Sequence, residues 1–214
     1  MLRCDNTGSA AVYLRPAFVQ ADKAAIVGLI RDNPFAQIVT HGGRGMEGSH
    51  LPFHLLEEAD GFTIAGHFAA GNPQCDAIGA ETDALIIFSG PHAYISPSWY
   101  ETQPSVPTWD FAAVHLYGRL EPVADPALIA SDIHAMATYD PGQFDVMALT
   151  QTYRDRMFAG IRAFRMRPSR VEGQWKMSQN RSITDRRRVV AALRAEGNAA
   201  VAEMVAATLP EAAE

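Results

Sequence analysis

The stretch FAQIVTHGGRGMEGSHLPFHLLEEADGFTIAGHF, residues 35–68, decides the expected fold of this chain. Apolar and polar residues alternate in three segments, which is the spacing of half-buried β-strands. SHLPFHLLEE, residues 49–58, is expected to form the middle strand. GGRGMEG, residues 42–48, supplies the permissive backbone of a hairpin turn, and Asp60-Gly61 supplies the next turn. These residues predict a three-stranded antiparallel meander.

Further strands and helices are predicted on both sides of this meander. Asp22 is expected to cap a helix that ends at Asn33-Pro34, and Asn72-Pro73 is expected to open a short helix. Ser182 and Asp185 resemble a capping box before another helix. The remaining strands are predicted at residues 84–90, 112–123 and 161–178, and the remaining helices at about 126–138, at 145–158 and in the alanine-rich C-terminal part.

About six or seven strands in mostly antiparallel order, with helices between and after them, predict a β-barrel with peripheral helices, an α+β fold. No low-complexity linker marks a boundary in the chain. We therefore expect a single domain over residues 1–214, with a helical insertion at about 126–158 and C-terminal helices at about 183–208.

The composition limits the compartment and the partners. The chain has 18 Lys and Arg against 24 Asp and Glu, a formal net charge of -6, which disfavours non-specific binding to nucleic acid. It has no uninterrupted apolar run of about 18 residues, and Arg3 and Asp5 stand where a secretion signal would be apolar. Cys4 and Cys75 form neither a disulfide framework nor a zinc motif. We expect a cytoplasmic protein that does not bind membranes.

Most familiar catalytic and metal motifs are absent from the sequence. His50 and His54 are expected on the same face of one strand, but no HxH or HExxH motif accompanies them, so no metal site is predicted. Ser96 and Ser98 lie near His92 without a GxSxG motif, which favours turn formers over nucleophiles. The glycine-rich GGRGMEG lacks the order of a phosphate-binding or dinucleotide-binding loop.

KMSQNRS, residues 176–182, concentrates polar donors at the end of a predicted strand. An ammonium, a guanidinium, two hydroxyls and two amides stand directly before a helix N-terminus, a combination that suits an anion or a polar heterocycle. The alternative is a solvated turn followed by a capped helix. Both interpretations remain open from these residues alone.

Four segments together resemble the PaiB family of FMN-binding negative transcriptional regulators, which is similar to the FMN-binding split-barrel proteins. The segments are GHFAAGNPQ (66–74), FSGPHAYISPSWY (88–100), VPTWDFAAVHLYG (106–118) and KMSQNRS (176–182). The resemblance extends over about residues 13–195 in family order. It implies a split β-barrel and a homodimer whose flavin sites lie at the subunit interface.

The resemblance also assigns candidate site residues. Residues 90–100 and 106–115 form a segment rich in Trp and Pro. The resemblance implies that this segment is a loop that forms an aromatic wall near the subunit boundary and the flavin; the alternative is that its aromatics cap the barrel core. The wall residues are Tyr94, Trp99, Tyr100 and Trp109. The cofactor-binding residues implied by the match are His50, Leu51, Pro52, Phe53, His67, Asn72, Gln74, Lys176, Gln179, Asn180 and Arg181.

One segment departs from the pattern of related flavin proteins. Flavin reductases and pyridoxamine-phosphate oxidases of this broad fold tend to carry Arg or Lys where this chain has Phe68-Ala69-Ala70-Gly71. The FMN phosphate, which carries close to two negative charges, would then depend on His67, Asn72, Lys176 or Arg181. The departure predicts weak FMN affinity and a site that can be empty after purification.

The resemblance predicts an FMN-binding protein with a role in negative regulation of transcription. Two alternatives stay open: a flavin-dependent oxidoreductase of the reductase or oxidase type, in which case FMN performs the redox chemistry, and a haem-binding split-barrel protein. No helix-turn-helix pattern supports DNA binding. If DNA is bound, we expect Arg186, Arg187 and Arg188 to contact it; the alternative is that they form a solvated helix face.

Overall fold

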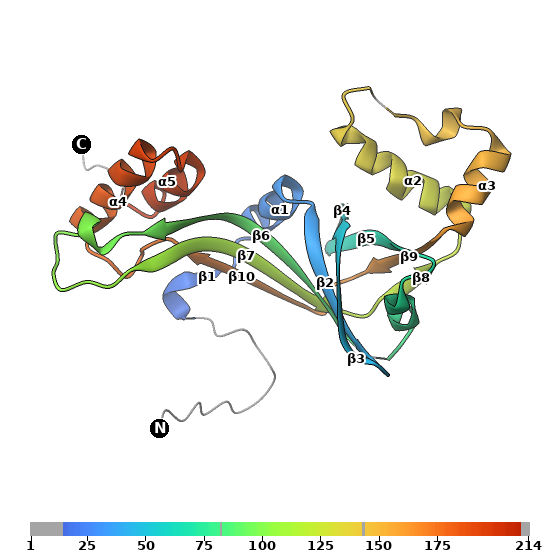
Figure 1. The fold of residues 1–214 in the computed structure, drawn as a ribbon, viewed down its shortest axis with the longest axis horizontal. Helices are drawn as coiled ribbons and strands as arrows, with labels where there is room; N and C mark the ends of the chain where they lie inside the picture. The colour runs from blue at the N-terminus through green and yellow to red at the C-terminus, as the bar shows by residue number, and fades with distance from the viewer. Residues whose placement is uncertain (1–14, 82, 143, 211–214) are drawn as a thin grey trace. The chain divides into compact units, whose positions relative to one another are not determined.

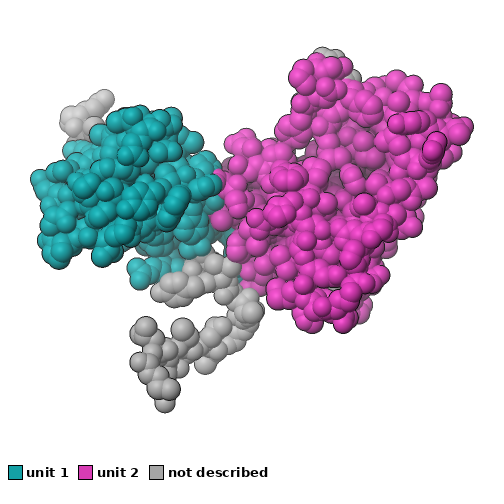
Figure 2. Space-filling view, in the orientation of Figure 1, with its two compact units in different colours: residues 1–21, 91–112, 172–214 teal, residues 22–90, 113–171 magenta. Residues whose placement is uncertain are grey.

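The computed structural model describes residues 15–81, 83–142 and 144–210, which form two compact units (Figure 2). Unit 1 contains residues 91–112 and the described residues before 22 and after 171, and unit 2 contains residues 22–90 and 113–171. Strands β6 (Ala84–Ile95), β7 (Thr108–Gly118) and β10 (Arg170–Lys176) supply residues to both units. Neither unit is therefore a continuous segment, and the expected single domain over residues 1–214 stays a prediction.

The strands form two sheets, drawn in Figure 1. The order is β1-β10-β7-β6-β2-β3 in the six-stranded sheet and β4-β5-β9-β8 in the four-stranded sheet. The other strands are β1 (Val19–Gln20), β2 (Phe35–Gly42), β3 (Gly45–Pro52), β4 (His54–Glu58), β5 (Gly61–Ala69), β8 (Glu121–Val123) and β9 (Ile161–Met166). Neighbours such as β2 and β3, β4 and β5, and β5 and β9 pair antiparallel. The predicted, mostly antiparallel β-fold with peripheral helices is confirmed.

Both tight turns of the predicted meander are present. Strand β2 pairs with β3 up to Gly42 opposite Gly45, so Gly43 and Arg44 form the turn. Gly45 has a φ of 94°, a left-handed conformation that favours glycine. Strand β4 pairs with β5 up to Glu58 opposite Gly61. The predicted hairpin turn at GGRG is therefore confirmed.

The predicted middle strand at residues 49–58 is wrong as one element, because the chain changes sheets at Phe53. Strand β3 ends at Pro52 in the six-stranded sheet, and β4 begins at His54 in the four-stranded sheet. The Phe53 N–H donates to the Pro34 carbonyl at 2.9 Å, and its side chain is buried. The prediction that His50 and His54 share one strand face is therefore also wrong.

The Trp- and Pro-rich segment contains more strand than predicted. Strand β6 continues to Ile95 and β7 starts at Thr108, so much of the expected loop is sheet. Ala93 and Ile95 are buried and Tyr94 is exposed, which is the alternation of a strand. The predicted helix after Asn72 is a short 3-10 helix, η2 (Pro73–Ala77). The Asn72 side chain caps it by accepting a hydrogen bond from the Gln74 N–H.

The helices lie outside the sheets (Figure 1). They are α1 (Lys23–Asp32), α2 (Pro126–Met136), α3 (Gln151–Ala159), α4 (Ile183–Ala195) and α5 (Ala199–Ala206). The predicted helix at 145–158 is shorter because Thr150 caps α3, and residues 146–148 form a separate 3-10 helix, η5 (Val146–Ala148). The predicted strand at 161–178 is two strands, β9 and β10, divided around Pro168. Within the described ranges, no helix is long and apolar enough to cross a membrane.

In unit 1, a buried carboxylate fastens the segment after β6 to helix α4. Asp185 is 1% exposed, and its Oδ1 accepts hydrogen bonds from the N–H groups of Glu101 at 2.7 Å and Thr102 at 3.3 Å. Burial by itself would raise the pKa of Asp185, but these N–H donors and Ser182 outweigh it and lower the pKa below its ordinary value. The ionised carboxylate therefore stabilises this contact.

Replacing Gly118 in unit 2 tests a close backbone approach. A Cβ at this position would lie 2.9 Å from the Arg167 carbonyl oxygen and 3.0 Å from Met166 Cγ. Because one of these atoms is backbone, Gly118→Ala should lower the free energy of unfolding by about 1–3 kcal/mol, measured by urea denaturation. In the control Gly28→Ala, nothing lies within 4 Å of the new Cβ in α1, and we expect a gain of about 0.5–1 kcal/mol. Equal effects of the two substitutions would contradict this packing.

Asp185→Asn tests the contact between the ionised Asp185 carboxylate and the N–H groups of Glu101 and Thr102. Because the pKa of Asp185 is lowered in the folded protein, its stabilising effect is complete above the unfolded-state pKa of about 3.9 and is lost as the pH falls through the folded-state pKa. The variant should be less stable by about 1–3 kcal/mol near pH 7, and the difference should shrink below about pH 4. Thermal melts from pH 3 to pH 7 measure it, with the exposed Asp83→Asn as control. A stability difference between variant and wild type that grows towards acid pH would show that the pKa of Asp185 is not lowered.

Candidate functional site

A cavity of about 410 Å³ lies in unit 1, where the start of β7 meets the end of β10 and the turn before α4. Small-molecule sites commonly have volumes of about 300–1,000 Å³. The apolar part of its lining includes Phe18, Val106 and Phe111. Charged and polar side chains complete the lining, and many of them come from the segments VPTWDF and KMSQNRS. Tyr100, the last residue of FSGPHAYISPSWY, also lines it, so three of the four resemblance motifs meet around one cavity.

Lys176 ties the two strands that form this cavity. Its Nζ lies 2.7 Å from Thr108 Oγ1 and 3.3 Å from Asp110 Oδ1, and it also donates to the carbonyl of Trp109. An ammonium group has three N–H donors, so these three acceptors use all of them. Lys176 therefore holds β7 against β10 and has no donor left for a ligand.

Asp110 is the buried centre of the same network. It is 0% exposed, and Ser178 Oγ donates to its Oδ2 at 2.6 Å. Burial raises the pKa of Asp110 above its ordinary value, although Ser178 and Lys176 each act to lower it. Ser178 has a φ of 56°, which is uncommon for a residue other than glycine. The residue that donates to Asp110 therefore has a strained backbone, and it lies in the turn that precedes Arg181.

Tyr100 and Arg181 form the part of the cavity lining that places a cation over an aromatic ring. Tyr100 is 2% exposed, and its buried hydroxyl has no hydrogen-bond partner in the part of the chain that the structure describes. The Arg181 guanidinium carbon lies 4.1 Å above the Tyr100 ring centroid, a cation–π arrangement. The Arg181 Nη1 also lies 3.5 Å from Ser105 Oγ. Among the described residues, no other group accepts a hydrogen bond from the Arg181 guanidinium, so the cavity suits a molecule with an apolar body and an anionic group.

The structure places the four predicted residues of KMSQNRS in different environments. Lys176, Asn180 and Arg181 line the cavity. The Gln179 amide instead folds back onto its own turn, where it accepts from the Met177 N–H and donates to the Trp175 carbonyl, each at 2.6 Å. The structure thus brings three of the four together.

In unit 2, Asn72 and Gln74 belong to a polar network that fastens η2 to the β2–β3 hairpin. The Gln74 side-chain amide donates to Thr40 Oγ1 at 3.0 Å and to the Glu47 carbonyl at 3.1 Å. Asn72 Nδ2 donates to Ser49 Oγ at 2.9 Å, and Ser49 in turn donates to Gln74. Gln74 is 2% exposed, so a ligand that contacted it would have to replace these bonds.

The predicted flavin residues of β3 and the corner are spread between surface and core. His50 is exposed and stacks on Phe35 at a centroid distance of 6.2 Å. Leu51 is half-buried, Pro52 is exposed, and Phe53 is buried. Because these side chains lie in different environments, only the backbone groups of this strand could contact the same edge of a ligand.

His67 is half-buried and lines a void of about 10 Å³ with His54 and Asp132. Burial lowers the pKa of both histidines below the ordinary value; for His54, the neighbouring Asp132 opposes that shift. Because the void has room for about one water molecule, His67 faces packed protein on this side.

The four predicted wall residues lie in two places within unit 1. Tyr94 and Trp109 are exposed neighbours, with ring centroids 6.2 Å apart in an edge-to-face arrangement. Trp99 lies in the 3-10 helix η3 (Pro97–Trp99), and Tyr100 follows it and lines the cavity. The exposed pair on β6 and β7 is thus separate in sequence and in environment from buried Tyr100.

The arginine triplet on α4 does not form one free basic face. Arg186 Nη1 bonds the Thr208 carbonyl and hydroxyl, and Arg188 Nε donates to the Trp99 carbonyl at 2.8 Å. Successive helical residues point about 100° apart, so three consecutive arginines diverge. This placement does not favour the predicted DNA contact.

The sequence interpretation missed Asp110 and Ser178 as site residues. The sequence signal for Asp110 is strand alternation, because Asp110 lies on the same face of β7 as buried Ala112, Val114 and Leu116. A carboxylate at a buried strand position needs a hydrogen-bonding partner. The partner, Ser178, is 68 residues away in the sequence, which the local pattern could not identify.

Comparison with known proteins agrees with these motifs. The model of the family described as "Putative FMN-binding domain" matches residues 12–170. The chain is 32% identical over 192 residues to protease synthase and sporulation protein PAI 2 of Bacillus subtilis (strain 168), with 87% of this chain and 91% of that protein covered.

Solved structures with low sequence identity share the fold. The FAD and haem binding protein from Mycobacterium smegmatis matches with a TM-score of 0.56 at 11% identity, over 74% of this chain and 73% of that chain. The conserved hypothetical protein Rv2991 from Mycobacterium tuberculosis matches with a TM-score of 0.58 at 12% identity, over 80% of this chain and 94% of that chain. The predicted split-barrel fold is thereby confirmed.

Tyr100→Phe tests whether the buried hydroxyl is unpartnered in the free protein. Removing a hydroxyl that makes no hydrogen bond relieves a desolvation cost, so the variant should be as stable as the wild type or more stable by about 1 kcal/mol. Chemical denaturation without added ligand measures this difference. Tyr153→Phe in unit 2, at an exposed position, is the control for loss of a tyrosine hydroxyl and should leave the stability nearly unchanged. A loss of stability on Tyr100→Phe would show that the hydroxyl already has a partner.

Proposed function

Because the chain belongs to the PaiB-type family of FMN-binding domains, we propose that it binds FMN and that the cavity of unit 1 holds the flavin. The observation that carries this proposal is the arrangement around Arg181, whose guanidinium lies over the Tyr100 ring beside an apolar wall in a cavity of about 410 Å³. A flat ring with a phosphorylated side chain matches this combination of groups.

The residues of the cavity fit FMN by their chemistry. Arg181 and Arg15 would hold the phosphate, since guanidinium groups match phosphate oxygens in pairs. Phe18 and Phe111 would contact the ring. Bound FMN would supply hydride or electron transfer. The protein residues would bind and orient the ring and exclude water from it.

The charge balance of the cavity supports the expectation of weak binding. Lys176 lies 3.3 Å from Asp110, so the ammonium charge is opposed by a neighbouring carboxylate when that group is ionised. The phosphate would therefore depend on the guanidinium groups. The predicted contacts from His50, Leu51, Pro52, Phe53, His67, Asn72 and Gln74 stay predictions, as does the homodimer with its flavin sites at the subunit interface.

For the biological role we propose negative regulation of transcription that does not depend on DNA contact by Arg186 and Arg188. Both side chains have intramolecular partners, and the net charge of the chain is -6. Non-specific DNA affinity comes mainly from Lys and Arg that neutralise phosphates. A gel shift at low salt tests the proposal: retention of promoter DNA that is lost in an Arg186→Gln/Arg188→Gln variant would overturn it.

An FMN titration tests the flavin site. The wild-type protein should quench FMN fluorescence in a saturable way, and Arg181→Gln should weaken FMN binding about tenfold or more because a charge-assisted contact is lost. Riboflavin, which lacks the phosphate, should bind both proteins equally. Arg187→Gln, on the exposed surface of α4, is the matched control.

Two results would contradict the proposal in different ways. No saturable binding by the wild-type protein would exclude FMN as its ligand. Saturable binding that is unchanged by Arg181→Gln but weakened by His67→Ala would move the flavin from the cavity of unit 1 to the β5 segment of unit 2.

A further inference from the structure

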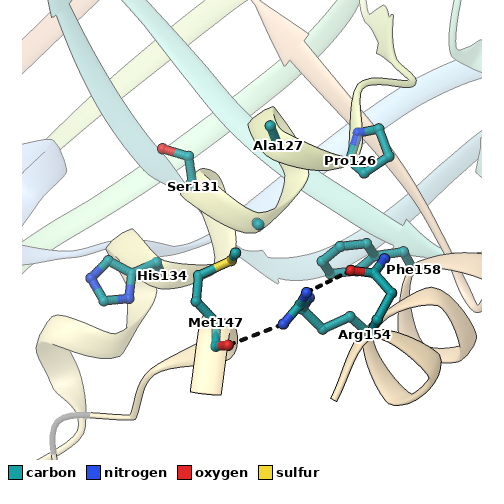
Figure 3. Close-up of a pocket in the computed structure, with 9 residues that line it drawn as sticks. Pro126, Ala127, Ser131, His134, Met147, Arg154 and Phe158 are labelled. Atoms are coloured by element: carbon teal, nitrogen blue, oxygen red, sulfur yellow. Dashed lines mark hydrogen bonds between the residues drawn. The ribbon is translucent and has the colours of Figure 1, made fainter. Parts of the chain in front are cut away.

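A second cavity, of about 430 Å³, lies in unit 2 within the helical insertion (Figure 3). One wall is helix α2, and the other is formed by η5 and helix α3. Its apolar lining includes Ala127, Ala130, Met147 and Phe158. It shares no residue with the cavity of unit 1 and none with the predicted flavin residues.

Helix α3 is unusual because it has no buried residue over its nine positions. A helix of this length is marginal in water unless an apolar face packs against the protein. Neighbouring apolar side chains are also exposed: Met147 is 58% exposed and Tyr153 is 53% exposed. Of these two side chains, Met147 lines the cavity, so exposed apolar surface is present there.

Arg154 is anchored in this cavity by acceptors of its own segment. Its Nη1 donates to the carbonyls of Met147 at 3.0 Å and Leu149 at 2.5 Å, and its Nη2 donates to Gln151 Oε1 at 2.6 Å. Figure 3 shows the Arg154 side chain reaching from α3 towards Met147. The guanidinium is therefore held in position before any ligand arrives.

Anchoring leaves part of the guanidinium for a ligand. Arginine has five N–H donors, and the described residues accept from three of them. Two N–H donors remain, which is the number that one carboxylate uses in a paired contact. His134 and Ser131 stand on the α2 wall of the same cavity (Figure 3). The polar groups thus favour a single carboxylate.

The apolar lining favours an aromatic body on that carboxylate. The Phe158 ring and the Met147 thioether are both groups that pack well against aromatic rings. Ala127 and Ala130 leave space opposite them on α2. We propose that this cavity binds a small aromatic carboxylate, with its carboxylate at Arg154 and its ring between Phe158, Met147 and Ala130.

The first test compares two probes on the wild-type protein by isothermal calorimetry, with FMN present at saturation. The probes are 1-naphthoate and its neutral analogue 1-naphthalenemethanol. We expect saturable 1-naphthoate binding, at least about tenfold tighter than binding of the alcohol, because only the carboxylate can pair with Arg154. Equal affinities, or no saturable binding of 1-naphthoate, would overturn the proposal.

The second test fills the cavity. Ala130 is 6% exposed and lines the cavity, so Ala130→Leu places three more carbon atoms inside it on a helix that tolerates leucine. The variant should bind 1-naphthoate at least about tenfold more weakly and keep its FMN titration unchanged. Ala195→Leu, at an exposed position of α4, is the matched control and should bind like the wild type.

Each remaining outcome has a definite meaning. Unchanged 1-naphthoate binding in folded Ala130→Leu would show that the probe binds elsewhere and would overturn the site. Arg154→Gln should remove the difference between naphthoate and the alcohol, and a difference that persists would overturn the role of Arg154. If Ala130→Leu does not fold, the comparison of the two probes on the wild-type protein decides.

Discussion

The fold of unit 2 depends on the corner at Phe53, where the chain leaves one sheet and enters the other. The ring packs edge-on against Phe88 and Phe164, at centroid distances of 5.8 and 6.4 Å. Gly66 lies directly beneath it, because a Cβ there would come within 3.0 Å of the Phe53 ring. The corner therefore needs a large ring at one position and no side chain at the other. It lets β3 and β4, only one residue apart, join different sheets.

Sequence reasoning predicted the local turns and missed this corner for a physical reason. The β2–β3 turn is set by nearby glycines, and the sequence shows those directly. Alternation continues across Pro52 and Phe53, so the pattern alone gives no sign that the pairing partner changes. Likewise, prolines and aromatics at residues 90–112 indicated a loop, although buried Ala93 and Ile95 continue β6. Side-chain periodicity reports which face is buried and says little about which strand lies alongside.

The same limit applies to the candidate site. KMSQNRS showed that polar donors gather before α4, but it could not show which of them are used inside the protein. Lys176 is committed to Thr108, Trp109 and Asp110, and Gln179 is committed to its own turn. The contacts of Lys176 join residues more than 60 positions apart, as does the contact between Ser178 and Asp110. Residue type predicted the cluster, and tertiary contacts decide the function of each member.

Both cavities contain a cationic side chain that hydrogen-bonds to the protein itself. The number of N–H donors decides whether such a side chain can also bind a ligand. Lys176 has three donors and three acceptors, so it can only hold β7 against β10. Arg154 gives three donors to its own segment and keeps two, and Arg181 stacks on Tyr100 through its face and keeps its edge. A planar guanidinium can therefore fix its own position and still pair with an anion. An ammonium has three donors and no planar edge, so at either arginine position it could not keep these internal contacts and also pair with an anion through two parallel N–H groups. Exchange of arginine for lysine at these sites is therefore not conservative.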